Sequence, residues 1–458
     1  MKLLELKNVS VSYGSHLPKV LQNINLVISS GQCHCVSGPT GSGKSSLLNL
    51  LAGVLNHPYD GDLCSNPQLL AGLVTQDPQT QLLRNTVGAE VAFTLENIGV
   101  PAKDMLPKVQ LALRRVGLHM RLDTKVNTLS LGQKYRLIMA SQLVCEPNLL
   151  LLDEPWAQLD DKGVSELLAV LRNLIQDGMA LVLVEHNPHA FADIIQYYWQ
   201  FEDGGLSEGI YTVNNDLQPH LDLQQSKKVE NDQTKHDVVI SAEAFEFRFD
   251  GSSALFTCPQ GFTLHAGEIV SLIGDNGSGK TSLLRALAGV LNLRQQLPVT
   301  VLERTPKLGI YGSELGFLMQ RPSRQLFETN VLAEMQFSLK RFDLPQIRAT
   351  KMLEELELTA LSNLSPHTLS YGQQHIIALA SLACLQPKVL LLDDPLAGMD
   401  KYYYSKVWYL LERLQSQGST ILLSSHRSIK HHVVSRQFGL REGQFKEEII
   451  EMGYKNEG

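Results

Sequence analysis

The sequence predicts an α/β protein made of two tandem copies of one domain, each with a mostly parallel sheet core. Two observations support this fold class. Long segments recur at an offset of about 240 residues, so that Gly132 and its neighbours reappear around Gly372. Within each copy, short and continuously apolar runs alternate with helical segments, which is typical of parallel strands covered on both faces.

The expected elements follow the same order in both copies. Strands are expected at 33–38, 149–153 and 180–186 in the first copy, and at 268–274, 388–393 and 420–426 in the second. Helices are expected to follow the first strand of each set, at 45–55 and 282–291. Between residues 76 and 132, Leu106, Val109, Leu113 and Val116 recur at spacings of three and four, which predicts one helix face. We therefore expect a helical subdomain inserted into each α/β core.

The repeat divides the chain into residues 1–213, a segment 214–237 and residues 238–458. The middle segment is polar, rich in Gln, Asn, Asp and Lys, and lacks apolar periodicity, so we expect a linker there.

Composition narrows the possible partners. The 458 residues carry a net charge of -7, with 43% apolar and 19% charged residues, which indicates folded domains and argues against nucleic acid as a partner. The six scattered cysteines suggest a reducing compartment, and Cys33 and Cys35 are expected to be core residues of a buried strand. No signal peptide and no run of ~20 apolar residues is present, so work at a membrane would require another subunit.

A glycine-rich motif, G-x-x-x-x-G-K-[S/T], occurs once in each copy between a strand and a helix. The glycines allow backbone N–H groups to surround phosphate oxygens, the lysine reaches the β- and γ-phosphates, and the hydroxyl binds Mg²⁺. We therefore expect nucleotide contacts from Gly38, Gly41, Gly43, Lys44, Ser45 and Ser46, and from Gly274, Gly277, Gly279, Lys280, Thr281 and Ser282.

Two consecutive acidic residues follow an apolar strand in each copy. Asp153 and Asp393 are placed to hold Mg²⁺, in part through water, together with Ser45 and Thr281. The next residue, Glu154 or Asp394, can orient or deprotonate the attacking water.

The most specific motif is L-S-x-G-Q, at 129–133 and 369–373. A serine and a glycine at the start of a helix form a second anion site. With this motif present, the chain resembles the ABC-type ATPases. That resemblance implies P-loop domains that pair head to tail, with each ATP between one phosphate loop and the opposite motif. The residues of the motif that would contact ATP are Ser130, Gly132, Gln133, Ser370, Gly372 and Gln373.

Further family positions match one by one. By this resemblance, Gln76 and Gln320 correspond to the Q-loop glutamine, and His186 and His426 correspond to the switch histidine. Asp160 and Asp400 occupy the D-loop position. Tyr13 and Phe249 are placed to stack on adenine. The chain departs from the family pattern at Asp394, at Ile376 (Arg136 in the first copy), and at Trp156 and Gln158.

The segments after Gln76 and Gln320 resemble those of the ATPases of energy-coupling factor transporters, which import vitamins or metal ions. The resemblance implies integral membrane partners, a transmembrane coupling protein and a substrate-binding component, and a peripheral location on the cytoplasmic face. It also implies membrane-subunit contacts from Gln79, Gln81, Arg84, Arg324 and Gln325. The alternatives are a soluble tandem ABC ATPase acting in translation and a sugar-type tandem importer ATPase. Pairing of the copies within one chain or between two chains stays open.

Overall fold

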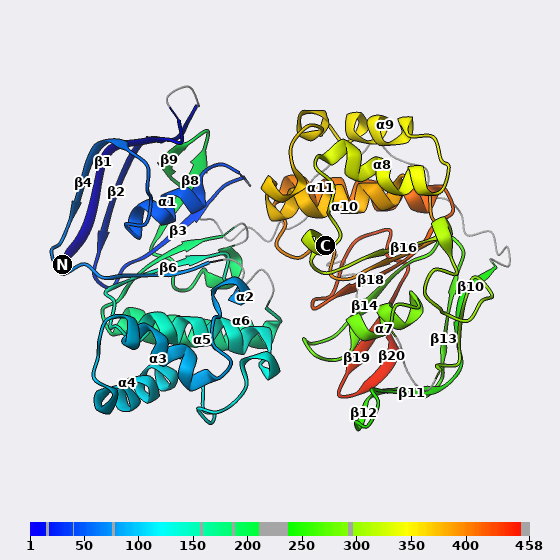
Figure 1. Cartoon of the computed structure of the whole chain (residues 1–458), viewed down its shortest axis with the longest axis horizontal. Helices are drawn as coiled ribbons and strands as arrows, with labels where there is room; N and C mark the ends of the chain where they lie inside the picture. The colour runs from blue at the N-terminus through cyan, green and yellow to red at the C-terminus, as the bar shows by residue number, and fades with distance from the viewer. Residues whose placement is uncertain are drawn as a thin grey trace, which may run out of the picture.

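A computed structural model describes residues 1–14, 18–39, 41–75, 78–155, 159–185, 188–209, 237–291 and 296–449. Residues 1–209, the first half, and 237–449, the second half, lie side by side and each contain a sheet with helices (Figure 1). Almost all of the predicted linker falls outside the described residues, so the domain boundaries stay a prediction.

The first half is organised around a six-stranded sheet in the order β5-β6-β7-β3-β8-β9. All neighbouring pairs are parallel except β8 with β9. A separate antiparallel sheet has the order β2-β1-β4. The strands are β1 (Lys2–Ser12), β2 (Lys19–Ser29), β3 (Cys33–Ser37), β4 (Tyr59–Ser65), β5 (Ala71–Val74), β6 (Leu149–Asp153), β7 (Ala180–Val184), β8 (Tyr197–Glu202) and β9 (Gly205–Glu208).

The second half repeats this plan with an eight-stranded sheet, β11-β12-β20-β19-β14-β18-β17-β16, and a three-stranded sheet, β13-β10-β15. The strands are β10 (Val238–Ala242), β11 (Phe245–Arg248), β12 (Ala254–Cys258), β13 (Phe262–His265), β14 (Ile269–Ile273), β15 (Val299–Val301), β16 (Leu315–Leu318), β17 (Val389–Leu392), β18 (Thr420–Ser425), β19 (Arg436–Arg441) and β20 (Gln444–Glu448).

The α-helices fall into matching sets. The first half contains α1 (Lys44–Leu51), α2 (Pro78–Gln81), α3 (Val87–Asn97), α4 (Ala102–Arg115), α5 (Leu131–Leu143) and α6 (Asp161–Gln176). The second half contains α7 (Lys280–Leu287), α8 (Val331–Arg341), α9 (Ile347–Glu355), α10 (Tyr371–Ala383) and α11 (Lys401–Ser416).

The central strands are buried on both faces, which explains their continuous apolar sequences. In β6, Leu149 and Leu151 pack in the core shared with α1 and the antiparallel sheet. Leu150 and Leu152 pack on the other side, with α5 and α6. Because successive side chains point to opposite faces of a strand, a run of leucines serves both cores at once. The predicted α/β cores are therefore confirmed.

The predicted helical insertion is present, but its apolar face was assigned partly wrongly. Val109 and Leu113 of α4 are buried, as is Val116 just beyond its end, whereas Leu106 is exposed. Met105 packs against the core in its place. A shift of one residue along a helix rotates a side chain by about 100°, so Leu106 lies on the solvent side.

The expectation for the cysteines of β3 is confirmed. Cys33 and Cys35 are fully buried, and all six cysteines of the chain are free thiols. Burial raises the pKa of Cys33 to about 12, which keeps this thiol protonated and unreactive.

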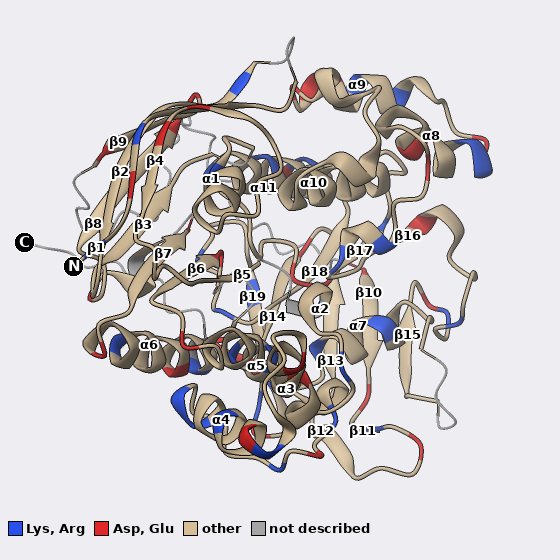
Figure 2. Cartoon of the chain, turned by 60° about the vertical axis from the view of Figure 1, so that its left-hand side comes forward, with Lys and Arg blue, Asp and Glu red and all other residues tan. Residues whose placement is uncertain are grey.

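Lys, Arg, Asp and Glu are distributed over both halves with the two signs intermixed (Figure 2). No helix among the described residues is both long enough and apolar enough to span a membrane.

Candidate nucleotide-binding sites

Each glycine-rich motif forms a loop between a strand and a helix, β3 to α1 and β14 to α7. Gly43 and Gly279, the last residues before the helices, have φ of 112° and 111°. The first glycine is required for another reason. A Cβ at Gly38 would lie 2.2 Å from the carbonyl oxygen of Phe201 in the neighbouring strand, and one at Gly274 would lie 2.4 Å from that of Leu440.

The lysine of each loop folds back over its own backbone. Lys44 Nζ donates to the carbonyl oxygens of Gly38 at 2.9 Å and Pro39 at 2.6 Å. Lys280 makes the equivalent bonds to Gly274 and Asp275. Burial lowers the pKa of both lysines, and neighbouring carboxylates oppose that effect. The ammonium groups are thus held at the mouth of the loop, where a phosphate would arrive.

A hydroxyl and a carboxylate meet beside each loop. Ser45 Oγ donates to Asp153 Oδ2 at 2.9 Å, and Thr281 Oγ1 donates to Asp393 Oδ1 at 3.0 Å. Two oxygen ligands of this kind suit Mg²⁺. Among the described residues other than the chain neighbours of each glycine, no atom lies within 4 Å of a Cβ built at Gly41 or Gly277, so the loops are open where phosphate oxygens would lie. The residues therefore fit a magnesium nucleotide.

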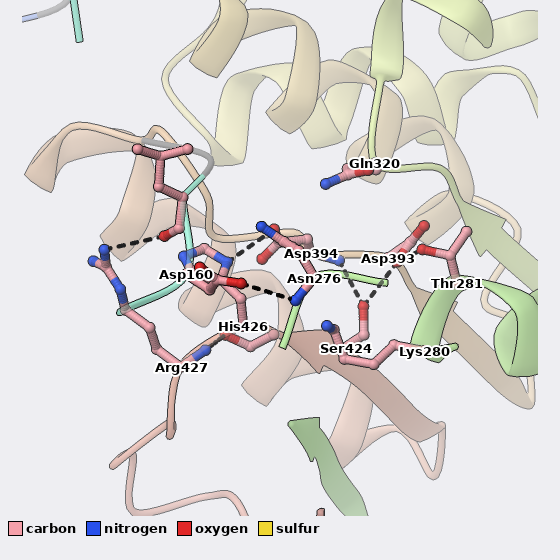
Figure 3. A network of polar contacts seen from close by, with 12 residues as sticks. Asp160, Asn276, Lys280, Thr281, Gln320, Asp393, Asp394, Ser424, His426 and Arg427 are labelled. Atoms are coloured by element: carbon pink, nitrogen blue, oxygen red, sulfur yellow. Dashed lines mark hydrogen bonds and ion pairs between the residues drawn. The ribbon is translucent and has the colours of Figure 1, made fainter. Parts of the chain in front are cut away.

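The acids that follow Asp153 and Asp393 share one backbone conformation but differ in surroundings. Glu154 and Asp394 both have positive φ, 46° and 53°. Glu154 is half-buried, whereas Asp394 is buried and its Oδ2 lies 3.2 Å from Nδ1 of His426 (Figure 3). Burial raises the pKa of Asp394, but His426, together with Lys280 and His375, outweighs burial and leaves that pKa below its usual value.

The L-S-x-G-Q segments begin helices α5 and α10. Ser130 and Ser370 are the N-caps, each accepting a hydrogen bond from the backbone N–H of Gln133 or Gln373. The glutamine side chains accept in return from the N–H of the serines, which completes a capping box. The glutamines thus fix the start of each helix, and the serine and glycine remain at the end where the helix dipole is positive.

One candidate nucleotide site is composite, because both halves of this chain line the same cavity. A cavity of about 430 Å³ is bounded by residues of the first half and by Ser370, Tyr371, Gly372 and Gly398 of the second. The first-half residues are Tyr13, Val20, Gly41, Gly43, Lys44, Ser45, Ser46 and Glu154. Ligand sites commonly have volumes of this order, about 300–1,000 Å³. We call this cavity site one. Because the first phosphate loop faces the helix start of the second half across it, the halves pair head to tail within the chain.

The equivalent region around the second phosphate loop is site two, and contacts between the halves occur there as well. Asn276 N donates to Asp160 Oδ2 at 3.2 Å, and Arg427 Nη2 donates to the carbonyl oxygen of Leu159 at 3.4 Å (Figure 3). The other oxygen of Asp160 caps α6 by accepting from Gly163 N. A D-loop carboxylate thus holds its own helix and the opposite phosphate loop together.

The two candidate adenine-stacking rings have different settings. Tyr13 lines site one, and its hydroxyl lies 2.7 Å from Ser46 Oγ. Phe249 is 41% exposed and packs edge-on against Phe247. Adenine stacking stays a prediction for both rings.

Two expected site residues, Gln76 and His186, lie outside the described residues, as do Trp156 and Gln158, which depart from the family pattern. Gln320 is described, and its carbonyl oxygen accepts from the hydroxyl of Tyr371 at 3.0 Å. This bond links Gln320 to the L-S-x-G-Q segment of the second half.

Two of the residues expected to contact a membrane subunit also bond to the backbone of their own half. Gln81 Oε1 accepts from Thr75 N and its Nε2 donates to Leu73 O, at the end of β5. Gln325 makes the same pair of bonds to Met319 N and Phe317 O beside β16. Both ends of each amide therefore hold the backbone of the turn, and direct contact of Gln81 or Gln325 with a membrane subunit stays a prediction.

We expect Gln325→Ala to lower the free energy of unfolding by about 1–3 kcal/mol, because it leaves two backbone groups without partners. Denaturant unfolding of the full chain measures the change. Gln346→Ala is a matched control, since Gln346 is exposed and its side chain does not cap α9. Equal stability of the two variants would mean that the backbone bonds of Gln325 contribute nothing.

Some residues that shape the sites carry no recognisable motif. Ser424 Oγ donates to Asp393 Oδ1 at 2.9 Å and accepts from Asp394 N at 3.0 Å, which ties the two acids together. In the first half, Arg136 holds the loop after α4 through Val116 O and Gly117 O and pairs with Glu166 at 2.6 Å. Its counterpart Ile376 is fully buried, so an apolar contact replaces that network.

Two phosphate loops with hydroxyl–carboxylate pairs lie on parallel sheets, and the first loop faces a helix start of the other half. This arrangement defines a P-loop nucleotide-binding protein with paired domains. The family model "ABC transporter" matches residues 21–157 and 259–397. The chain belongs to the ABC transporter family and is an ABC ATPase with two cassettes.

Three similar proteins illustrate the match. A candidate ABC transporter ATP-binding protein of Bacillus cereus is 30% identical, covering 92% of this chain and 86% of its own. The structure of cbiO1 from Clostridium perfringens, described as part of the ABC transporter complex cbiONQ, is 28% identical over 45% of this chain and 88% of its own, with a TM-score of 0.42. A structure of ribosome-bound archaeal Pelota and ABCE1 shares the fold, with a TM-score of 0.68 at 18% identity. The match covers 96% of this chain and 78% of the chain in that structure.

Proposed function

We propose that this ATPase energises a membrane importer of the energy-coupling factor type, which takes up a vitamin or a metal ion. ATP bound in the composite sites would close the two halves, and the closure would be passed to a transmembrane coupling protein. Because the closed state alone lets one ATP contact both halves, ATP favours closure by its differential affinity.

The observation that carries the proposal is a matched pair of exposed apolar side chains on rigid turns. Leu83 and Phe327, at equivalent positions after the Q-loops, are 66% and 58% exposed. The buried Glu90 accepts hydrogen bonds from Leu83 N and Arg84 N, at 3.0 and 2.7 Å. Glu334 accepts in the same way from Phe327 N and Glu328 N. A fixed turn that presents a large apolar side chain to solvent suits docking to another subunit.

Charged groups surround these apolar residues. Arg84 lies over the ring of Phe93, 4.3 Å from its centroid, and pairs with Glu96 at 3.4 Å. The chain offers the turns of both halves, so two contacts with one coupling protein are available. Gln79 lies in α2 close to the first turn, and Arg324 lies just before the second.

We expect the double variant Arg84→Glu, Arg324→Glu to bind ATP normally but to lose uptake of the cargo, because charge reversal at a docking surface costs assembly rather than nucleotide contacts. Leu83→Ser with Phe327→Ser should have the same effect. The measurements are co-purification with integral membrane subunits from detergent extracts and uptake by cells carrying the variants.

Leu308→Ser is the matched control, since Leu308 is 75% exposed and lies in the segment between β15 and β16, outside both turns. Normal uptake in either double variant would contradict the docking surface. Recovery of ribosomal proteins in place of membrane subunits would favour the translation alternative, and a sugar-type importer would be recognised by the identity of the membrane subunits.

A further inference from the structure

Three potential metal ligands converge on the second half, away from both phosphate loops. Glu412 lies near the end of α11, and His431 and His432 lie in the segment between β18 and β19. Their ligand atoms all lie within 4.8 Å of one another. The same carboxylate oxygen, Glu412 Oε1, is 3.9 Å from Nε2 of His431 and 3.7 Å from Nε2 of His432.

These separations are too long for hydrogen bonds. They are close to the spacing between ligands around a small cation, because bonds of about 2.0–2.1 Å in a tetrahedral site place neighbouring ligand atoms about 3.4 Å apart. The two distances to Glu412 Oε1 would have to shorten by only a few tenths of an ångström to reach that spacing.

The ring of His431 is held in place by stacking. It lies parallel to Trp408, with ring centroids 3.7 Å apart. Trp408 is one helical turn before Glu412 on α11, so the same helix supplies the stacking surface and the carboxylate. His431 Nδ1 is buried without a hydrogen-bond partner among the described residues, so packing fixes the ring. Burial also lowers the pKa of His431 to about 4, which leaves the imidazole neutral at physiological pH.

The first half provides an internal comparison. Helices α6 and α11 correspond residue by residue, and Arg172 stands where Glu412 stands in the second half. Arg172 pairs with Asp193 of the following loop at 2.6 Å, an ordinary surface ion pair. The second half has an acid on the helix and two imidazoles on the loop. An ion pair with Glu412 would need only one histidine, in its protonated form. Two imidazoles directed at the same carboxylate oxygen instead suit a cation that all three side chains share.

We propose that Glu412, His431 and His432 bind one divalent transition-metal ion, with water completing its coordination. Two imidazoles and a carboxylate suit Zn²⁺, Co²⁺ or Ni²⁺ rather than Mg²⁺ or Ca²⁺. The site is open to solvent on the side of His432, whose side chain is 67% exposed, while those of His431 and Glu412 are 20% and 33% exposed. The proposal does not depend on the type of transporter.

The position of the site connects it to site two. The segment that carries the histidines follows His426 and Arg427, and α11 begins at Lys401 directly after its N-cap, Asp400. An ion would join the far ends of these two segments. It would thereby restrain the elements that position His426 and the D-loop of the second half.

Zn²⁺ binding to the full chain, freed of metal and nucleotide by a chelator, tests the proposal. We expect calorimetric titration to show that the unaltered chain binds one Zn²⁺. In His432→Gln and Glu412→Gln, binding should be lost or the affinity for Zn²⁺ should fall by about 100-fold, the upper end of the effect that disturbing the surroundings of a metal has on its affinity. His431→Phe keeps an aromatic ring against Trp408 and should lose the ion as well. Co²⁺ should give a visible absorption band in the unaltered chain and in none of these three ligand variants.

His119→Gln is the control, because His119 is an exposed histidine of the first half. It should leave the affinity unchanged. Melting temperatures without metal establish that the variants fold, and Zn²⁺ should raise that temperature only where the three ligands are intact. The proposal is overturned if the Kd of the unaltered chain for Zn²⁺ is above about 100 µM, which corresponds to a binding free energy of about -5.5 kcal/mol. It is equally overturned if the ligand variants bind as tightly as His119→Gln, which would place the ion elsewhere, for example at the exposed Cys64.

Discussion

Replacing Ser370 by aspartate is expected to slow ATP turnover at site one by about 100-fold, although Lys44 and Glu154 of that site belong to the other half. Ser370 and Gly372 line the cavity of site one opposite the first phosphate loop. An aspartate there would place a negative charge beside the phosphates of ATP and remove a hydroxyl donor. Loss of one preorganised donor alone typically costs about 10²–10³ in rate.

The choice of aspartate separates this effect from damage to the fold. Ser370 is the N-cap of α10, and aspartate is as good an N-cap as serine. The helix start should therefore survive the substitution. Stability measured by thermal unfolding should stay close to that of the unaltered chain.

A photoreactive ATP analogue shows which site has lost turnover. The analogue is trapped by vanadate and cross-linked, and the labelled peptides are identified by mass spectrometry. Ser370→Asp should abolish trapping on peptides of the first half. The matched variant Ser130→Asp should act on the second half, because Ser130 is the N-cap at the equivalent helix start. If Ser370→Asp removed trapping from its own half and spared the first, the composite site would be refuted.

The repeat made most of the fold predictable from the sequence. Strand β6 and its counterpart β17 are buried on both faces, so their unbroken apolar runs identified them directly. The phosphate loops were equally clear, since Gly43 and Gly279 must adopt a left-handed backbone that other residues rarely take. Such positions are determined by local chemistry, which a sequence motif records.

Features that depend on tertiary contacts were not predictable. The amide of Gln81 is satisfied by the backbone of β5, and nothing in the local sequence distinguishes that role from contact with a partner. Ser424 and Arg427 act through neighbours that the fold brings to them. The approach of His432 to Glu412 likewise depends on how the segment after β18 packs against α11.

The two sites are expected to differ in catalytic output, with site one performing most of the hydrolysis. Glu154 lines the cavity of site one. Asp394, its counterpart, is buried and bonded to His426, and its pKa is lowered. A carboxylate with a lowered pKa is a weaker proton acceptor, and a general base works best when its pKa lies near the operating pH.

Reach adds to the difference. Aspartate is shorter than glutamate by one methylene, a bond of ~1.5 Å. Glu154 and Asp394 have almost the same left-handed φ, so the backbone conformation of the residue itself does not restore the lost length. Misplacement of a reacting group by about 1 Å can cost on the order of 100-fold in rate. ATP and Mg²⁺ should still bind at site two, because Lys280, Thr281 and Asp393 form the same contacts as their counterparts.

The test compares Glu154→Gln with Asp394→Asn in the assembled complex, since both changes remove the ionisable group and keep the shape of the side chain. We expect Glu154→Gln to reduce steady-state turnover by about 10²–10⁴, the usual contribution of a general base, and Asp394→Asn to leave a substantial fraction. Nucleotide affinity, measured separately, should change little in either variant, because neither phosphate loop is altered. Equal losses of turnover, or a larger loss for Asp394→Asn, would show that the aspartate site hydrolyses ATP as well as the glutamate site, and that the bond to His426 supports the base instead of restraining it.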